Sequence, residues 1–482
     1  MKRTLSVICL ISLLASLAAC GESADTPEST DSPETQYTAP EVDYGGKTVT
    51  ITGYSYSDSW AILRYNIGLE EENGDNINDA IVKRNRAVEQ ELNVNIEMIP
   101  LSKDDRSSPA VLEKYVMAQE DVITYGMQMN CGLSKLLTTD GMLVDLKTIP
   151  TLDLTKPWWN QKANDEYTLY GKQLAAVGDA CFFNLGAPVV MYFSKDLLEK
   201  NQLENPYQLV YDGKWTLDKL AKMAAQGASD VNGDQTMDAN DIYGLAAEPD
   251  TTYYSLYGFG NRFSDRDASG NIKITLNNER TADVVERMIN LIRDESTSLC
   301  SQRWLAEYGN AHSGFYAPKL MANELLFYSN QLHVSLTLRT METDFGIIPM
   351  PKYDEAQKDY ISIANTWFSD HIVVPVTNGD LELVGHLLDA MGYYGKQYIT
   401  TAFMDEAIAN KGVRDEDSLK MIEMVLDNQV FDVALLFDWG GMRTMISQMG
   451  GSFETNFASK WAEISAKVDT ELAATVAMLK GE

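Results

Sequence analysis

The stretch Lys47-Thr-Val-Thr-Ile-Thr-Gly53 begins the folded part of the chain and, with the residues after it, predicts the fold class. Val49 and Ile51 alternate with threonines, which is the period-2 pattern of a half-buried β-strand. An amphipathic helix is expected from about Asn78, and the alternating stretch 94–98 follows as a second strand. A strand, a helix and a strand in this order form a β-α-β unit, which favours a parallel sheet.

The alternation of strand and helix patterns continues along the chain, so we expect an α/β fold. Ser194 and Thr216 stand where a helix N-cap is expected, because their hydroxyls can accept a hydrogen bond from the first turn. The further expected strands are 121–124, 188–193, 345–348 and 372–376, and the further expected helices are 194–200, 216–227, 281–293 and 456–479.

The first residues have the pattern of a secretory signal. Lys2 and Arg3 precede an apolar run over 5–17, which is too short to span a membrane as a helix. The tetrapeptide Leu17-Ala-Ala-Cys20 resembles the bacterial lipobox, which implies cleavage after residue 19 and lipid attached to Cys20. An ordinary signal peptide with a chance cysteine is the alternative. Residues 20–44 are acidic and poor in apolar side chains, so we expect a flexible stalk and a lipid-anchored protein on the extracytoplasmic face of the cell membrane.

Charge and cysteine content narrow the function classes. The 482-residue chain has a formal net charge of −31, which argues against nucleic acid as a partner because phosphates require Lys and Arg. Cys131, Cys181 and Cys300 are isolated and allow at most one disulfide, so no disulfide framework holds the fold. The four histidines show no metal-site spacing.

Several segments, in order, resemble a known family. They include Lys156-Pro-Trp-Trp-Asn-Gln161 and Phe437-Asp-Trp-Gly-Gly441, with others at 74–85, 193–198, 213–218 and 345–352. Together they resemble extracellular solute-binding proteins of bacterial ABC importers, the group of the maltose- and oligosaccharide-binding proteins. The resemblance implies a two-lobed α/β fold, periplasmic-binding-protein-like and of type II, with a hinge and a ligand cleft between the lobes. It implies that residues 45–154 and 318–372 form lobe 1 and that residues 155–317 and 373–482 form lobe 2.

Aromatic and polar residues at expected strand ends are the candidate sugar contacts. Sugar C–H faces pack on aromatic rings, hydroxyls need paired donors and acceptors, and ligands of open α/β sheets bind at the carboxyl ends of strands. Trp367 and Trp439 lead, since each lies beside polar residues or glycine; packing in the core is the alternative for every aromatic. The stretch that begins at Asn184 lacks the carboxylate that much of the maltose-type group carries there, so the sugar is not inferred. The candidate ligand-binding residues are Tyr54, Tyr56, Trp60, Tyr125, Asn184, Tyr254, Tyr257, Tyr328, Asn330, Asn365, Trp367, Asp438 and Trp439.

The acidic stretch 230–241 matches a twelve-residue calcium loop. Hard oxygen ligands at alternate positions suit Ca²⁺, and one structural Ca²⁺ is expected here. Gln235 departs from the pattern because it replaces the usual glycine, and a solvated acidic turn is the alternative. The expected ligands are Asp230, Asn232, Asp234, Thr236 through its backbone carbonyl, Asp238 and Asp241.

The family resemblance implies a monomeric receptor that captures a sugar or oligosaccharide and delivers it to an ABC permease. A surface glycan-binding or sensing lipoprotein without transport, and a binder of a non-sugar solute, remain alternatives. The sequence has no GxSxG, Ser/Lys or phosphate-loop motif that would favour an enzyme. The pair Tyr253-Tyr254 resembles a ferric-ion site, but its surroundings are acidic, whereas phenolate ligands need nearby positive charge.

Overall fold

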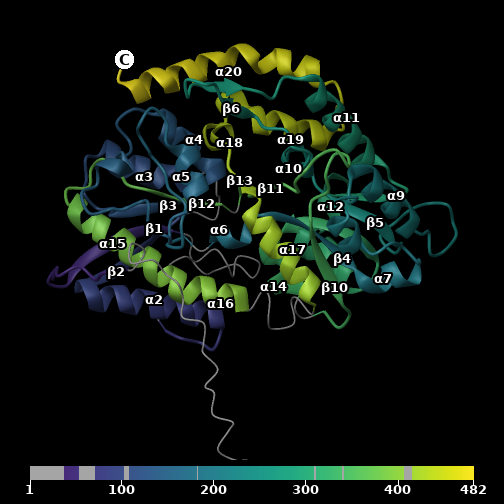
Figure 1. Cartoon of the computed structure of the whole chain (residues 1–482), viewed down its shortest axis with the longest axis horizontal. Coiled ribbons are helices and arrows are strands. Elements are labelled where there is room, and N and C mark those ends of the chain that lie inside the picture. Colours follow the sequence, from purple (N-terminus) through teal and green to yellow (C-terminus); the bar gives the residue numbers. More distant parts are fainter. Residues whose placement is uncertain are drawn as a thin grey trace, which may run out of the picture. The chain divides into compact units, whose positions relative to one another are not determined.

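Two mixed β-sheets and the helices around them organise the chain (Figure 1). The structure, a computed structural model, describes residues 37–53, 71–101, 108–181, 183–308, 311–338, 341–367, 369–405 and 415–482. Cys20, Tyr54, Tyr56 and Trp60 lie outside these residues, so the expectations placed on them stay predictions. No helix within the described ranges is both long and apolar enough to cross a membrane.

The first sheet contains the β-α-β unit predicted from the opening stretch. Its strand order is β12-β3-β1-β2, and β1 pairs in parallel with β2 and with β3, while β12 runs antiparallel to β3. Helix α2 (Asn76–Leu92) connects β1 to β2; the Asp75 carboxylate caps its first turn, and Asn93 ends it at a left-handed φ of 51°. The strands are β1 (Lys47–Gly53), β2 (Val94–Pro100), β3 (Tyr125–Met129) and β12 (Asp370–Val373).

The second sheet has the strand order β10-β4-β9-β5-β8. Strand β5 is parallel to β9 and to β8, whereas β4 is antiparallel to both β9 and β10. Two further two-stranded sheets pair β11 (Ser362–Ile363) with β13 (Gln429–Val430) and β6 (Ser264–Arg266) with β7 (Ile272–Ile274). The main strands are β4 (Val189–Ser194), β5 (Tyr243–Ala247), β8 (Ser298–Cys300), β9 (Leu325–Gln331) and β10 (Phe345–Pro349).

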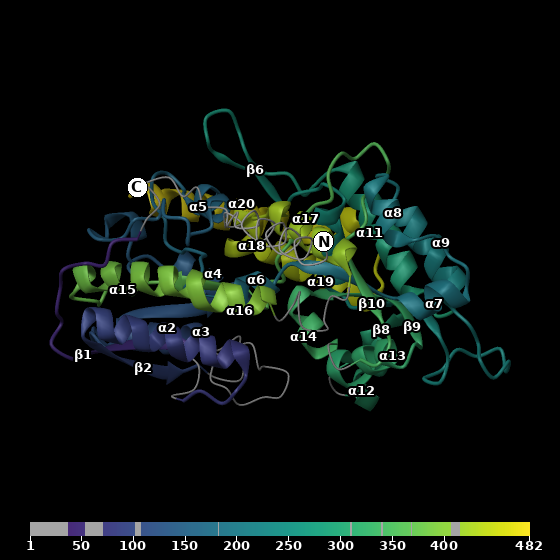
Figure 2. The ribbon, with the colours of Figure 1, turned by 60° about the horizontal axis from the view of Figure 1, so that its bottom comes forward.

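Helices complete both groups, and their ends agree with the cap residues seen in the sequence. Ser194 accepts a hydrogen bond from the Leu197 amide at the start of α7, and Thr216 does the same for the Lys219 amide in α9. Helices α2 and α15 pack side by side (Figure 2). The longer helices besides α2 are α3 (Ser108–Met117), α4 (Asn130–Thr138), α9 (Leu217–Gly227), α10 (Thr251–Gly258), α11 (Glu279–Arg293), α12 (Ser301–Tyr308), α15 (Leu381–Tyr394), α17 (Glu416–Asp427), α19 (Met442–Ser452) and α20 (Phe457–Lys480). Shorter ones are α5 (Gln161–Tyr167), α6 (Phe183–Gly186), α7 (Lys195–Lys200), α8 (Pro206–Tyr211), α13 (Ala317–Met321), α14 (Ser335–Leu338), α16 (Thr401–Met404) and α18 (Val433–Phe437).

The sheet topology corrects the expected lobe boundaries. The segment 318–372, expected in lobe 1, contributes β9 and β10 to the second sheet, where both strands pair with β4. Only its end enters the first sheet, as the start of β12. Conversely α15, expected in lobe 2, packs on α2 beside the first sheet. The strand expected at 121–124 is also displaced, because pairing with β1 begins only at Tyr125 and pairing with β12 only at Gly126.

Candidate functional site

A group of polar side chains lies at the carboxyl ends of strands β5 and β9. These parallel neighbours pair Ala246 with Tyr328, so the chain leaves β5 beside the last residues of β9. Glu248 and Asp250 follow β5 directly, and Asn330 lies near the end of β9. Ligands of open α/β sheets bind at this edge, which makes the position the first place to look for a site.

His312 joins these strand ends from a single π-helical turn, His312–Tyr316. Its Nε2 lies 2.7 Å from Glu248 Oε2, and its Nδ1 lies 3.0 Å from the Tyr328 hydroxyl and 2.9 Å from Asn330 Nδ2. Burial lowers the pKa of His312, but the charge of Glu248 and the hydrogen bond to it outweigh burial, so the pKa is raised. The His312 side chain keeps 33% of its surface exposed, so the cluster remains accessible at that point.

Trp367 is fixed by Asp250, beside this cluster. Its indole Nε1–H donates to Asp250 Oδ2 at 3.1 Å, and the Ser447 hydroxyl donates to the other oxygen of the same carboxylate. Burial, and then the nearby charge of Glu248, raise the pKa of Asp250. Trp367 is partly exposed. The indole N–H is therefore paired within the protein.

The segment 365–367 is held at both ends, which defines where Trp367 lies. The Asn365 amide donates to the Tyr254 hydroxyl, and Asn365 Oδ1 accepts from the Trp367 backbone N–H at 2.8 Å. The Cys131 backbone N–H donates to the Thr366 carbonyl at 3.0 Å. Cys131 lies just after β3, and Tyr254 belongs to helix α10. The segment 365–367 therefore connects the carboxyl end of β3 in the first sheet with helix α10.

Asp438 and Arg443 form a buried ion pair near the same place. The Arg443 guanidinium lies 3.6 Å from Asp438 Oδ2, and the Arg443 backbone N–H donates to Asp438 Oδ1 at 2.9 Å. Burial raises the pKa of Asp438, an effect that the charge of Arg443 opposes. Arg443 is 8% exposed, its Nε has no hydrogen-bond partner among the described residues, and its charge acts on Asp250.

Five sequence candidates lie together in or directly beneath this site: Tyr254, Tyr328, Asn330, Asn365 and Trp367. We use the name strand-end cluster for six residues, of which sequence reasoning had selected three. The six are Glu248, Asp250, His312, Tyr328, Asn330 and Trp367.

The structure places the other described candidates in packing positions. Trp439 is 0% exposed, stacks on Phe437 and donates its indole N–H to Thr475 Oγ1 at 3.0 Å, so no face of its ring can receive a sugar here. Tyr257, expected in a loop, is buried in α10 and donates to Asp432 at 2.7 Å. Tyr125 is fully buried inside β3. Asn184 holds the crossing segment, since its amide group bonds the Asp370 carbonyl and the Ser369 hydroxyl.

Sequence reasoning missed Glu248, Asp250 and His312. A signal existed for the two carboxylates, because they directly follow the strand-like stretch that begins at Ile242 and therefore stand at a strand's carboxyl end. No signal existed for His312. Its neighbours in sequence are ordinary helix residues, and only the π-helical turn and the long-range contact with Glu248 bring it into the cluster.

The predicted calcium loop is closed by its own amides. Asp230 accepts from the Gly233 and Gln235 amides at 2.7 Å each, and Asp241 accepts from the Val231 amide at 2.8 Å and from the Asp238 amide at 2.7 Å. Gln235 adopts a φ of 68°, the left-handed conformation that the usual glycine would provide. Across the described residues, no group of three or more His, Cys, Asp or Glu is arranged to hold a metal ion.

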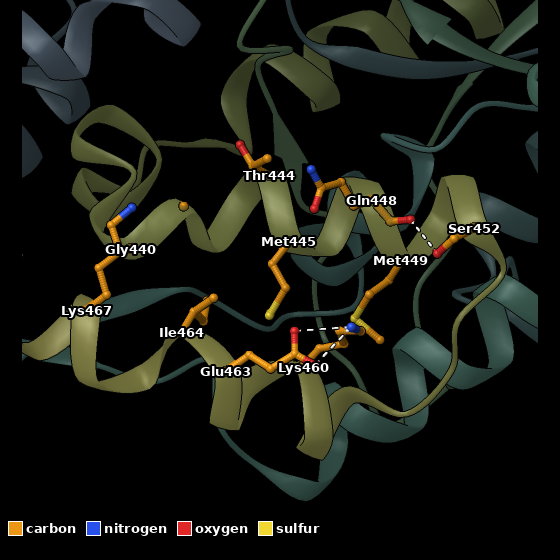
Figure 3. A pocket seen from close by; sticks show the side chains of 11 residues that line it. Gly440, Thr444, Met445, Gln448, Met449, Ser452, Lys460, Glu463, Ile464 and Lys467 are labelled. Atoms are coloured by element: carbon orange, nitrogen blue, oxygen red, sulfur yellow. Dashed lines mark hydrogen bonds and ion pairs between the residues drawn. The ribbon is translucent and has the colours of Figure 1, made fainter.

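A separate hollow of about 700 Å³ lies between α19 and α20 (Figure 3). Met445 and Met449 of α19 and Ile464 of α20 give it an apolar floor, and Lys460, paired with Glu463 at 2.9 Å, stands at its side. It shares no lining residue with the strand-end cluster.

Cys131, Cys181 and Cys300 form no disulfide with one another.

Comparison with known proteins gives structural likeness without close sequence relatives. No family model matches the chain, and no curated protein matches it. The structure is similar to UgpB from Mycobacterium tuberculosis in complex with glycerophosphocholine, with a TM-score of 0.58 and 13% identity over 82% of this chain and 95% of that one. It is similar to a sugar transporter from Rhizobium etli in an open conformation, with a TM-score of 0.56 and 14% identity over 90% and 99% of the two chains. It is also similar to an ABC substrate-binding protein from Listeria monocytogenes in complex with cycloalternan, with a TM-score of 0.55 and 12% identity over 90% and 98%. The chain therefore has the two-domain α/β fold of these proteins.

Proposed function

We propose that this protein is a carbohydrate receptor on the extracytoplasmic face of the cell membrane, anchored by lipid at Cys20, which delivers its ligand to an ABC permease. The observation that carries the proposal is the partly exposed Trp367 beside the polar side chains of the strand-end cluster. A sugar needs an apolar face and paired hydrogen-bonding groups at once. The strand-end cluster offers an aromatic ring and hydrogen-bonding side chains close to the ends of β5 and β9.

The hydrogen-bonding inventory of the cluster suits hydroxyl groups. Glu248 and Asp250 are acceptors, and Asn330 and the nearby Arg443 are donors. Arg443 Nε is buried without a partner among the described residues, and a buried donor gains by acquiring an acceptor. A ligand hydroxyl can accept from such a donor and donate to a carboxylate. Hydroxyls that reach groups on both sheets would favour the closed state, because a ligand shifts an equilibrium only by its differential affinity.

Proteins with the same fold support binding rather than catalysis. The Listeria monocytogenes neighbour is described as an ABC substrate-binding protein, and a protein from Thermotoga maritima is described with maltose bound. We propose the same class of role for this chain, as a monomer. One structural Ca²⁺ at 230–241 remains part of the proposal, on the strength of the ligand spacing alone.

A non-sugar solute is the second candidate. The neighbour from Mycobacterium tuberculosis was solved with glycerophosphocholine, so the fold also holds ligands that are not sugars. A glycan-sensing lipoprotein without transport would use the same site and differ only in lacking a permease. Uptake of a labelled ligand by cells with and without the protein separates that alternative from import.

Two measurements on the purified protein test the proposal. Native mass spectrometry should show a bound mass that corresponds to a sugar or oligosaccharide. A thermal-shift screen of mono- and oligosaccharides should find at least one that raises the melting temperature. If no sugar does so, while a peptide, polyamine or iron salt does, the carbohydrate assignment fails although the receptor fold stands.

A further inference from the structure

Three carboxylates lie at or beside the strand-end cluster, and their partners differ in kind. Glu248 contacts His312 at 2.7 Å, and Asp438 contacts the Arg443 guanidinium at 3.6 Å. Asp250 instead accepts hydrogen bonds from two neutral donors, the indole N–H of Trp367 and the hydroxyl of Ser447. Within the described residues Asp250 forms no salt bridge.

Of these three carboxylates, Asp250 is therefore the one without an ionisable partner in direct contact among the described residues. Arg443 acts on it only at longer range, and Glu248 adds a second negative charge nearby. A carboxylate removed from water carries a desolvation cost that a nearby cation repays and a nearby anion increases. Unit charges a few ångströms apart interact much more strongly in such a place than in bulk water.

Trp367 places a ligand close to this charge. The indole nitrogen lies 3.1 Å from Asp250 Oδ2, so a sugar ring stacked on the indole face would carry one edge within reach of the carboxylate. A hydroxyl at that edge can donate to Asp250. An ammonium group can donate and also neutralise it, whereas a ligand carboxylate can do neither.

We propose that Asp250 makes the site selective by charge, so that it accepts amino sugars and neutral sugars and rejects acidic sugars. This inference rests on the proposed function and adds the substrate class and the residue that sets it. Among sugars of the same configuration, the order of affinity is then amine, hydroxyl, carboxylate. The overall acidity of the chain would disfavour acidic sugars from a distance, but only Asp250 would make the preference sensitive to one side chain.

Matched sugar sets test this proposal by calorimetric titration at pH 7.5. The probes are glucosamine, glucose and glucuronate, with the corresponding galacto and manno sets. In each set that binds, we expect the amine at least tenfold tighter than the acid. Asp250→Asn keeps an oxygen that accepts the Trp367 N–H, and it should reduce that ratio at least tenfold. The exposed Glu355 supplies the control, since Glu355→Gln removes the same charge elsewhere and should leave the ratio unchanged.

The outcomes separate this proposal from the proposed function. Acidic sugars that bind as tightly as amines, or a ratio unchanged in Asp250→Asn, overturn charge selection while leaving the sugar receptor intact. Absence of binding by every sugar, with binding of a non-sugar solute, overturns both. If Asp250→Asn does not fold, as judged by circular dichroism, Asp250→Ser replaces it, since it removes the same charge and should reduce the ratio at least tenfold.

Discussion

Trp439 and Trp367 are expected to respond oppositely to replacement by alanine. Trp439 has no exposed surface, stacks on Phe437 and donates to Thr475 at 3.0 Å. Loss of a buried Trp typically costs about 3–5 kcal/mol, through lost burial and the cavity left behind. The same change at Trp367, which is partly exposed, should cost about 1 kcal/mol. Trp439→Ala should therefore remove a large fraction of a total stability of about 5–15 kcal/mol.

Urea unfolding of both variants, followed by far-ultraviolet circular dichroism, measures this difference. The midpoint of unfolding should fall strongly for Trp439→Ala and little for Trp367→Ala, while sugar affinity should fall only for Trp367→Ala. The close contact of Gly440 with Val468, where an added Cβ would lie 2.4 Å from Cγ2, shows that the loop around Trp439 has no slack to fill the gap. If Trp439→Ala unfolds at the wild-type urea concentration but loses sugar binding, the packing argument is refuted and the residue is a ligand platform.

Four further predictions concern sites elsewhere in the chain. Gly244→Ala should destabilise by about 3 kcal/mol or more, measured by urea unfolding, since the new Cβ would lie 1.9 Å from the Ala224 carbonyl oxygen; wild-type stability would contradict this backbone packing. His312→Gln should lower the melting temperature most at low pH. The pKa of His312 is raised above that of a free histidine, so its stabilising contribution is complete below the free value and is lost as pH rises through the higher folded-state pKa. A difference that grows above pH 8 would contradict the pairing with Glu248. If the loop 230–241 binds Ca²⁺ in solution, EGTA should lower the melting temperature and added Ca²⁺ should restore it. At a hundredfold excess over Kd, bound Ca²⁺ should stabilise the folded state by about 2.7 kcal/mol. Identical melting curves with EGTA and with Ca²⁺ would contradict a bound ion. Cys20→Ala should release the protein from the membrane fraction, as seen by fractionation and immunoblotting, and a variant that stays bound would place the anchor elsewhere.

Local patterns were enough to predict most elements of this fold. The alternation at Val49 and Ile51 and the helix after it gave the β-α-β unit, since period and end signals are local properties. Ser194 and Thr216 cap the predicted helices because a cap needs only its own hydroxyl and the next turn. Lobe membership depends instead on long-range pairing. The sequences of strands β9 and β10 would suit either sheet, and only their pairing with β4 places them in the second sheet.

The site was less predictable than the fold, because whether an aromatic side chain can contact a ligand depends on its burial in the folded protein. Trp367 and Trp439 both stand beside polar residues or glycine, and nothing local distinguishes them. The difference arises because α20 covers Trp439 through Thr475, whereas Trp367 stays partly exposed beside Asp250. Trp158 and Trp159, which follow a proline in a loop, and Trp215, which stands just before helix α9, are buried as well.

Calorimetric titration of sugars into the purified protein tests the central claim most directly. We predict saturable one-to-one binding of at least one sugar to the wild-type protein, and affinity lost by at least tenfold in Trp367→Ala while the variant keeps the wild-type melting temperature within a few degrees. Heats of dilution alone for every sugar in the panel, or full affinity in Trp367→Ala, would contradict a carbohydrate site at the carboxyl ends of β5 and β9.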